Sequence, residues 1–113
     1  MISQIRPRDL QAWLQAQPAG STPVVLDVRE AHELQIAHVQ AQGFTLLTIP
    51  MGMVPLRLSE LDPAQAIACL CHHGGRSMQV AGFLESRGFA KVANIAGGIH
   101  AWATELDSSI PTY

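Results

Sequence analysis

Short apolar runs alternate with amphipathic stretches along the whole chain. Five of these runs are rich in aliphatic and β-branched side chains and therefore predict strands, at residues 2–5, 24–28, 45–49, 66–71 and 92–95. Residues 66–71 are apolar at every position, and 24–28 is interrupted only by Asp27. Such runs lack the alternation of a half-exposed strand and are typical of strands buried on both faces of a parallel sheet.

The segments between these runs predict helices. Pro7 can occupy the first position of a helix, where a missing N–H costs nothing, and residues 30–37 and 53–61 are compatible with short helices. Three helices carry an apolar stripe at helical spacing: Leu10, Trp13 and Leu14; Val80, Phe83 and Leu84, before Gly88; and Ile99, Trp102 and Leu106. We expect Trp13 and Trp102 to anchor the two terminal helices in the core.

The alternation of strands and helices predicts an α/β fold, in which helices flank a mainly parallel central sheet of about five strands. A chain of 113 residues is the length of one domain, so we expect residues 1–113 to form a single domain. Hydrophobic residues make up 48% of the chain and charged residues 14%, which favours a compact, well-buried fold.

Charge and hydropathy argue against nucleic acids and membranes as partners of this chain. The net charge is −2 and no basic run is present, so we expect no nucleic-acid binding. No stretch approaches the ~20 apolar residues of a membrane span, and residues 1–13 lack the apolar core of a secretion signal. We expect a reduced, cytoplasmic protein. Cys69 and Cys71 on one strand would have Cα atoms about 6.6 Å apart and parallel side chains, which is poor disulfide geometry.

Cys71 ends a buried strand and begins a short loop that leads into a helix. Ligands of open α/β sheets bind beyond the carboxyl ends of the strands. Gly74 and Gly75 allow successive N–H groups to turn inward, and the helix starting near Ser77 adds its positive end. Arg76 would add a fixed positive charge at the far rim. A thiol in this cradle should be largely thiolate and nucleophilic, and the cradle would hold the oxyanion part of a donor such as thiosulfate.

The loop from Cys71 to Ser77 resembles the active-site loop of the rhodaneses, which commonly reads Cys-x-x-Gly-x-Arg-Ser in single-domain bacterial forms. Three further blocks resemble the same family, and they extend the resemblance over nearly the whole chain: residues 26–30 with Glu33 and His38, residues 49–50, and residues 96–102. Residues 39–42 depart from the Pro-Gly-Ala that often follows the His, so we expect that connection to be built differently.

The resemblance implies a three-layer rhodanese-like fold and a sulfurtransferase. Cys71 would take a sulfane sulfur from thiosulfate or a similar small anionic donor, hold it as a persulfide, and pass it to cyanide, a thiol or a protein acceptor. Neither a metal nor an organic cofactor is implied. Loop residues would stabilise the persulfide anion through their backbone N–H groups: His72, His73, Gly74, Gly75, Arg76 and Ser77.

Other chemistry-bearing residues have a plainer interpretation. Cys69 lies in the middle of an apolar run and is expected to be core. Zinc binding by Cys69, Cys71, His72 and His73 is disfavoured, because ligands packed into one strand end do not easily close a tetrahedron. His72 and His73 are equally compatible with tuning of the entrance charge and with simple loop filling. Asp27 and Arg29 predict an internal ion pair or loop brace that supports the site.

Two rival functions remain open. Small phosphatases and arsenate reductases also use a Cys–loop–Arg cradle, but the phosphatases of this fold resemble one another in having one residue more between Cys and Arg than the four found here. A rhodanese-like binding module would recognise a partner without turnover. The presence of Cys71 argues against such a module but is compatible with a pure sulfur carrier.

Overall fold

The computed structural model describes residues 2–113, and its centre is a sheet of five parallel strands. The strands follow the apolar runs closely: β1 (Ser3–Ile5), β2 (Val24–Asp27), β3 (Thr45–Thr48), β4 (Ile67–Leu70) and β5 (Val92–Ile95). Their order across the sheet is β1-β5-β4-β2-β3, and each neighbouring pair is parallel. The predicted α/β fold with a parallel central sheet is therefore confirmed.

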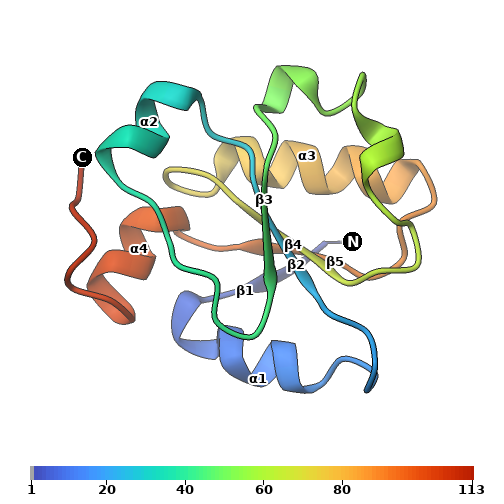
Figure 1. Cartoon of the computed structure of the whole chain (residues 1–113), viewed down its shortest axis with the longest axis horizontal. Helices are drawn as coiled ribbons and strands as arrows, with labels where there is room; N and C mark the ends of the chain where they lie inside the picture. The colour runs from blue at the N-terminus through green and yellow to red at the C-terminus, as the bar shows by residue number, and fades with distance from the viewer. Residues whose placement is uncertain (1) are drawn as a thin grey trace.

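Helices pack on both faces of this sheet and complete three layers (Figure 1). On one face lies α3 (Gly75–Ser86), and on the other lie α1 (Leu10–Gln15), which follows the 3-10 turn η1 (Pro7–Asp9), and α4 (Gly98–Glu105). The short helix α2 (Ala31–Ile36) lies beside the loop between β4 and α3 (Figure 1). Pro7 occupies the beginning of η1, as its lack of an N–H predicts.

The core is divided by the sheet into two apolar clusters. Val24, Leu26 and Cys69 face α3, whereas Val25 and Ala68 face α1 and α4. This division follows from the period of two in a strand, which sends successive side chains to opposite faces. All four positions of β2 and of β4 are buried, which explains why both strands are nearly continuous apolar runs.

Two details of the predicted helices were wrong. Residues 53–61 form no α-helix but the separate 3-10 turns η2 (Met51–Met53) and η3 (Leu58–Glu60), because Pro55 has no N–H to continue the hydrogen bonds of η2 and the backbone leaves helical angles at Arg57 (φ −109°, ψ 19°). Leu106 lies beyond the end of α4 and is 50% exposed, so it is absent from the buried stripe. Trp102 is buried as expected, but Trp13 is only partly buried.

The carboxyl ends of β2, β4 and β5 lie together at one edge of the sheet, because the three strands are adjacent and parallel. Asp27 ends β2, Cys71 directly follows β4, and Gly97 and Gly98 follow β5. Segments far apart in the sequence thus meet around one thiol. Within residues 2–113, none of the helices has the length and apolar character needed to cross a membrane.

Candidate active site

The Cys71 thiol lies at the base of the loop between β4 and α3, where two donors reach it. The backbone N–H of Gly74 donates to the Cys71 Sγ at 3.1 Å, and the Ser77 Oγ lies 3.2 Å from the same sulfur. Only 1% of the Cys71 surface is exposed. A reactant must therefore approach the sulfur through the loop itself, and small anions are favoured over bulky reagents.

Glycine at positions 74 and 98 allows the loop to close tightly around the sulfur. Gly74 has φ +107° and precedes the first residue of α3, and a Cβ there would come 3.2 Å from the backbone nitrogen of Gly97. From the other side, the first turn of α4 holds the loop: the N–H of Ile99 donates to the Cys71 carbonyl at 2.8 Å. Close backbone approach of this kind requires residues without a Cβ.

Cys69 lies on β4 and faces the core rather than the loop. It is fully buried, and this burial raises the pKa of its thiol to about 12, with a smaller contribution from Cys71. A thiol with such a pKa stays protonated at neutral pH and is a poor nucleophile. Both cysteines are free. Within residues 2–113, no group of three or more His, Cys, Asp or Glu side chains is placed to hold a metal ion.

Arg76 is held at the rim of the loop by an ion pair with Glu33. From the sequence, Glu33 was named only as part of the family resemblance, and this pair was not predicted. Its two terminal nitrogens donate to the Glu33 carboxylate at 2.6 and 2.9 Å, and the Arg76 side chain is 33% exposed. Hydrogen bonding to Arg76 is the main reason why the pKa of Glu33 lies well below its usual range. The same pair raises the pKa of Arg76. Arg76 therefore lies near the cradle as one half of an ion pair, with its charge balanced by Glu33, rather than as a donor to the sulfur.

Asp27 and Arg29 form the expected internal ion pair. The Arg29 guanidinium donates to the Asp27 carboxylate at 2.8 to 3.1 Å, and both side chains are buried. Arg29 also donates to the hydroxyl of Tyr113 at 3.0 Å, and that hydroxyl donates to Glu33 at 2.7 Å. The pair thus braces the end of β2 and α2, which carry the partner of Arg76, and makes no direct contact with Cys71.

His72 and His73 belong to a stack of rings along the outer side of the loop. The His72 ring lies between those of Tyr113 and His73, with centroids 3.8 and 3.9 Å away, and His100 lies 5.2 Å from His73. The His72 Nε2 also bonds to the backbone oxygen of Tyr113 at 2.6 Å. Burial lowers the pKa of His72, which favours the neutral ring that stacks best. Tyr113 could not be assigned to the site from the sequence, because it is far from the loop along the chain.

Asn94 is the second residue that was missed. It lies on β5 and is 2% exposed, and its Oδ1 is 2.5 Å from the Ser77 Oγ. A polar residue within an otherwise apolar strand was the available signal, since buried polar groups almost always have hydrogen-bond partners. Asn94 thereby connects the neighbouring strand to the thiol through Ser77.

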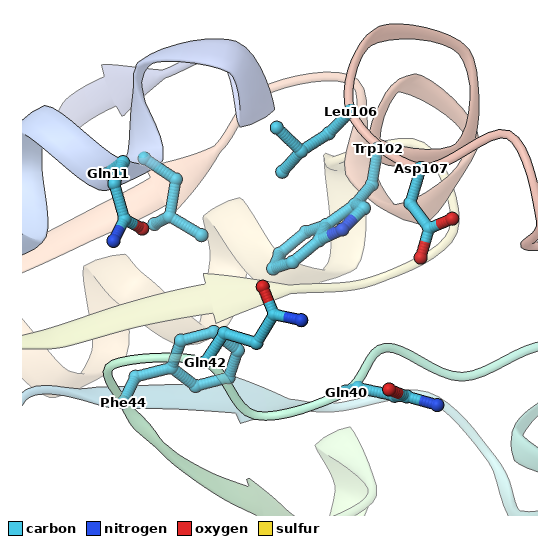
Figure 2. Close-up of a pocket in the computed structure, with 8 residues that line it drawn as sticks. Gln11, Gln40, Gln42, Phe44, Trp102, Leu106 and Asp107 are labelled. Atoms are coloured by element: carbon cyan, nitrogen blue, oxygen red, sulfur yellow. The ribbon is translucent and has the colours of Figure 1, made fainter.

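A separate pocket lies away from the loop, on the face of the sheet covered by α1 and α4 (Figure 2). Its volume is about 410 Å³, and Figure 2 shows carboxamide, aromatic and carboxylate side chains around it. It is lined by Leu10, Gln11, Gln40, Gln42, Phe44, Trp102, Leu106 and Asp107. None of these side chains is a thiol, so the pocket offers no counterpart to the chemistry of the Cys71 loop.

The ion pair between Arg76 and Glu33 predicts a pH-dependent stability. We expect Glu33→Gln to lower the free energy of unfolding by about 2 kcal/mol near neutral pH, because Arg76 loses a charged acceptor. The folded-state pKa of Glu33 is depressed, so its contribution is fully present above the unfolded value of about 4.3. The contribution is lost as the pH falls through the lower folded value, and the difference between wild type and variant should shrink in acid.

Urea unfolding of both proteins at about pH 7 and about pH 3 measures this difference. Glu60→Gln is the matched control, because the Arg57–Glu60 pair is also bidentate but lies at an exposed position. It should change stability little at either pH. An equal effect of the two substitutions, or a difference that does not depend on pH, would contradict a special contribution from Glu33.

Three comparisons bear on this site. The model of the family described as "Rhodanese-like domain" matches residues 9–105. The chain is 38% identical over 114 residues to the "Rhodanese-like/PpiC domain-containing protein 12, chloroplastic" of Arabidopsis thaliana, covering 99% of this chain but only 38% of that protein. It is 34% identical to a "Sulfurtransferase" of Allochromatium vinosum, covering 91% and 90% of the two chains.

A solved structure supports the same relationship. The crystal structure of a rhodanese-like domain protein from Staphylococcus aureus superposes with a TM-score of 0.74 at 25% identity, over 99% of both chains. The match therefore includes the five strands, the helices and the loop between β4 and α3.

Proposed function

Because the chain belongs to the rhodanese-like sulfurtransferase family, we propose that it moves sulfane sulfur from thiosulfate or a similar anionic donor to a thiophilic acceptor. The observation that carries this proposal is the placement of the Cys71 Sγ, which receives the Gly74 N–H and lies beside the Ser77 hydroxyl at the end of β4. Such a cradle stabilises negative charge on the Cys71 sulfur, which is what the attacking thiolate requires.

In the first half-reaction, the Cys71 thiolate attacks the outer sulfur of thiosulfate. The new S–S bond forms as the old one breaks, and sulfite leaves with the electron pair of the broken bond. The negative charge passes from the Cys71 Sγ to the terminal sulfur of the persulfide. In the second half-reaction, cyanide or a thiolate attacks that terminal sulfur and releases the Cys71 thiolate. The sulfur atoms carry all the electrons, so no cofactor is required.

The loop residues divide this work. Backbone N–H groups of residues 72–77 would hold the donor and the persulfide anion, with Gly74 and Gly75 allowing the close approach. Arg76, fixed by Glu33, would attract the anionic donor. Asp27 and Arg29 would support the site by fixing the segment that carries Glu33. His72 and His73 lie on the outer side of the loop and would contact the acceptor.

We further propose that residues 1–113 form one domain that acts in the cytoplasm, where thiol acceptors stay reduced. The acceptor would be a small thiol or a protein thiol. The name of the Arabidopsis relative assigns the chloroplast to that protein, and this chain spans only 38% of its length.

Intact-mass measurement after incubation with thiosulfate tests the proposal. We expect the protein to gain the mass of one sulfur atom, and to lose it with formation of thiocyanate when cyanide is added. Retention of the sulfur in the presence of cyanide and thiols would indicate a sulfur carrier instead. Hydrolysis of an aryl phosphate without any added sulfur would indicate a phosphatase. We expect no such hydrolysis, because a phosphoryl transition state needs donors for three equatorial oxygens and hence a wider loop.

A further inference from the structure

The hydroxyl of Ser77 lies between two buried acceptors. Its Oγ is 3.2 Å from the Cys71 Sγ and 2.5 Å from the Asn94 Oδ1, while Ser77 itself is fully buried. A serine hydroxyl has one proton and can donate it to only one of the two at a time. The sulfur and the carboxamide oxygen therefore compete for the same hydrogen bond.

The orientation of Asn94 makes its Oδ1 an acceptor. Its Nδ2 donates to the Gln4 Oε1 at 2.9 Å and to the Gly74 carbonyl at 3.1 Å, so both N–H bonds have acceptors. The Oδ1 then faces Ser77. Asn94 is only 2% exposed, so water cannot replace a hydrogen-bond donor that the Oδ1 loses. When Ser77 donates to sulfur, this oxygen loses its partner, and an unpaired buried carbonyl is unfavourable.

We propose that Asn94 is a positioning residue that favours the sulfur-loaded form of Cys71 over the free thiolate. This inference rests on the proposed function. In the free thiolate the Cys71 Sγ carries the charge and attracts the Ser77 proton, which leaves the Asn94 Oδ1 unpaired. In the persulfide the Sγ is a neutral bridging sulfur and a weak acceptor, so Ser77 returns its proton to Asn94.

The charge movement in the loading step explains the preference. As the Sγ forms its bond to the donated sulfur and sulfite leaves with the electron pair, the negative charge moves outward by one sulfur atom. The terminal sulfur then depends on the loop N–H groups, and the Ser77–Asn94 bond is restored at the same time. Loading thus recovers a buried hydrogen bond that the thiolate had weakened, without any oxidant or net transfer of a proton.

The test is the equilibrium ratio of loaded to unloaded protein at fixed thiosulfate and sulfite concentrations and at one alkaline pH. Intact mass gives the ratio directly. We expect Asn94→Ala to lower it about 10-fold, because the persulfide loses the restored bond. In a Ser77→Ala background the same Asn94→Ala change should have almost no effect, because no hydroxyl proton remains to be shared.

Gln4→Ala is the matched control. It removes an acceptor of the Asn94 Nδ2 but leaves the Oδ1 facing Ser77, so the ratio should stay close to that of wild type. If Asn94 only anchors the Gly74 carbonyl, Asn94→Ala will shift the ratio equally with and without Ser77, which would overturn the inference. Urea unfolding of each variant shows whether it folds. Ser77→Ala deletes only one oxygen atom, so we expect this variant to fold and the double-variant comparison to be measurable. Failure of wild type to load at all would instead reject the proposed function.

Discussion

Cys71→Ser is expected to abolish sulfur transfer, with a loss of at least about a thousandfold, whereas Cys69→Ser should retain most of the activity. Only Cys71 reaches the donors of the loop, where the Gly74 N–H and the Ser77 hydroxyl meet its sulfur. Cys69 faces the core, and its raised pKa keeps it protonated. A serine hydroxyl at position 71 cannot accept a sulfane sulfur, so the loss should affect the first half-reaction itself.

Thiosulfate:cyanide turnover and intact mass after thiosulfate treatment measure both variants. Cys69→Ser places a hydroxyl in a fully buried strand and should cost about 1–3 kcal/mol of stability, so its activity is compared below its unfolding transition. Cys71→Ser should gain no sulfur at all. If Cys71→Ser still gains a sulfur, or if Cys69→Ser folds but cannot load, the nucleophile would be Cys69 and not Cys71.

The parts of the fold that could be predicted from the sequence are those that depend on residues close together along the chain. The strands 24–28 and 66–71 were correct because burial on both faces leaves a run without alternation. The Cys71 loop was recognisable because a cysteine, two glycines and an arginine follow a strand end within a few residues. The segment 53–61 was wrong because compatibility with a helix does not ensure one, and Pro55 supplies no N–H to carry the hydrogen bonds through the segment.

The missing parts of the site depend on contacts between distant segments. Asn94 reaches the thiol only because β5 pairs with β4 and places it beside the helix that carries Ser77. Tyr113 reaches His72 and Glu33 because the chain returns to α2 after α4 (Figure 1). The polar Asn94 within an apolar strand indicated a buried hydrogen bond, but the partners of Asn94 and of Tyr113 could not be named from the sequence, since both contacts result from strand order and from the path of the last residues.

Gly98→Ala is expected to have the second-largest effect, although Gly98 carries no reactive group. Gly98 has φ +61°, and a Cβ there would lie 2.5 Å from the Cys71 carbonyl oxygen and in conflict with the backbone of His72. The clash involves backbone atoms, so the loop must move away from α4. We expect a loss of about 3 kcal/mol in the free energy of unfolding from the left-handed backbone and the clash together. Sulfur transfer should fall about a hundredfold, because the displaced loop no longer positions the sulfur and its donors.

Gly82→Ala provides the matched control, because Gly82 is exposed on α3 and a Cβ there would meet nothing within 4 Å. Alanine in a helix interior is more favourable than glycine, so this variant should gain about 0.5–1 kcal/mol and keep its activity. Urea unfolding and thiosulfate:cyanide turnover are measured on both variants. If Gly98→Ala were as stable and as active as Gly82→Ala, the first turn of α4 could not be in contact with the Cys71 loop. The bond from the Ile99 N–H to the Cys71 carbonyl would then have no part in holding the nucleophile, and the loop would owe its shape to α3 alone.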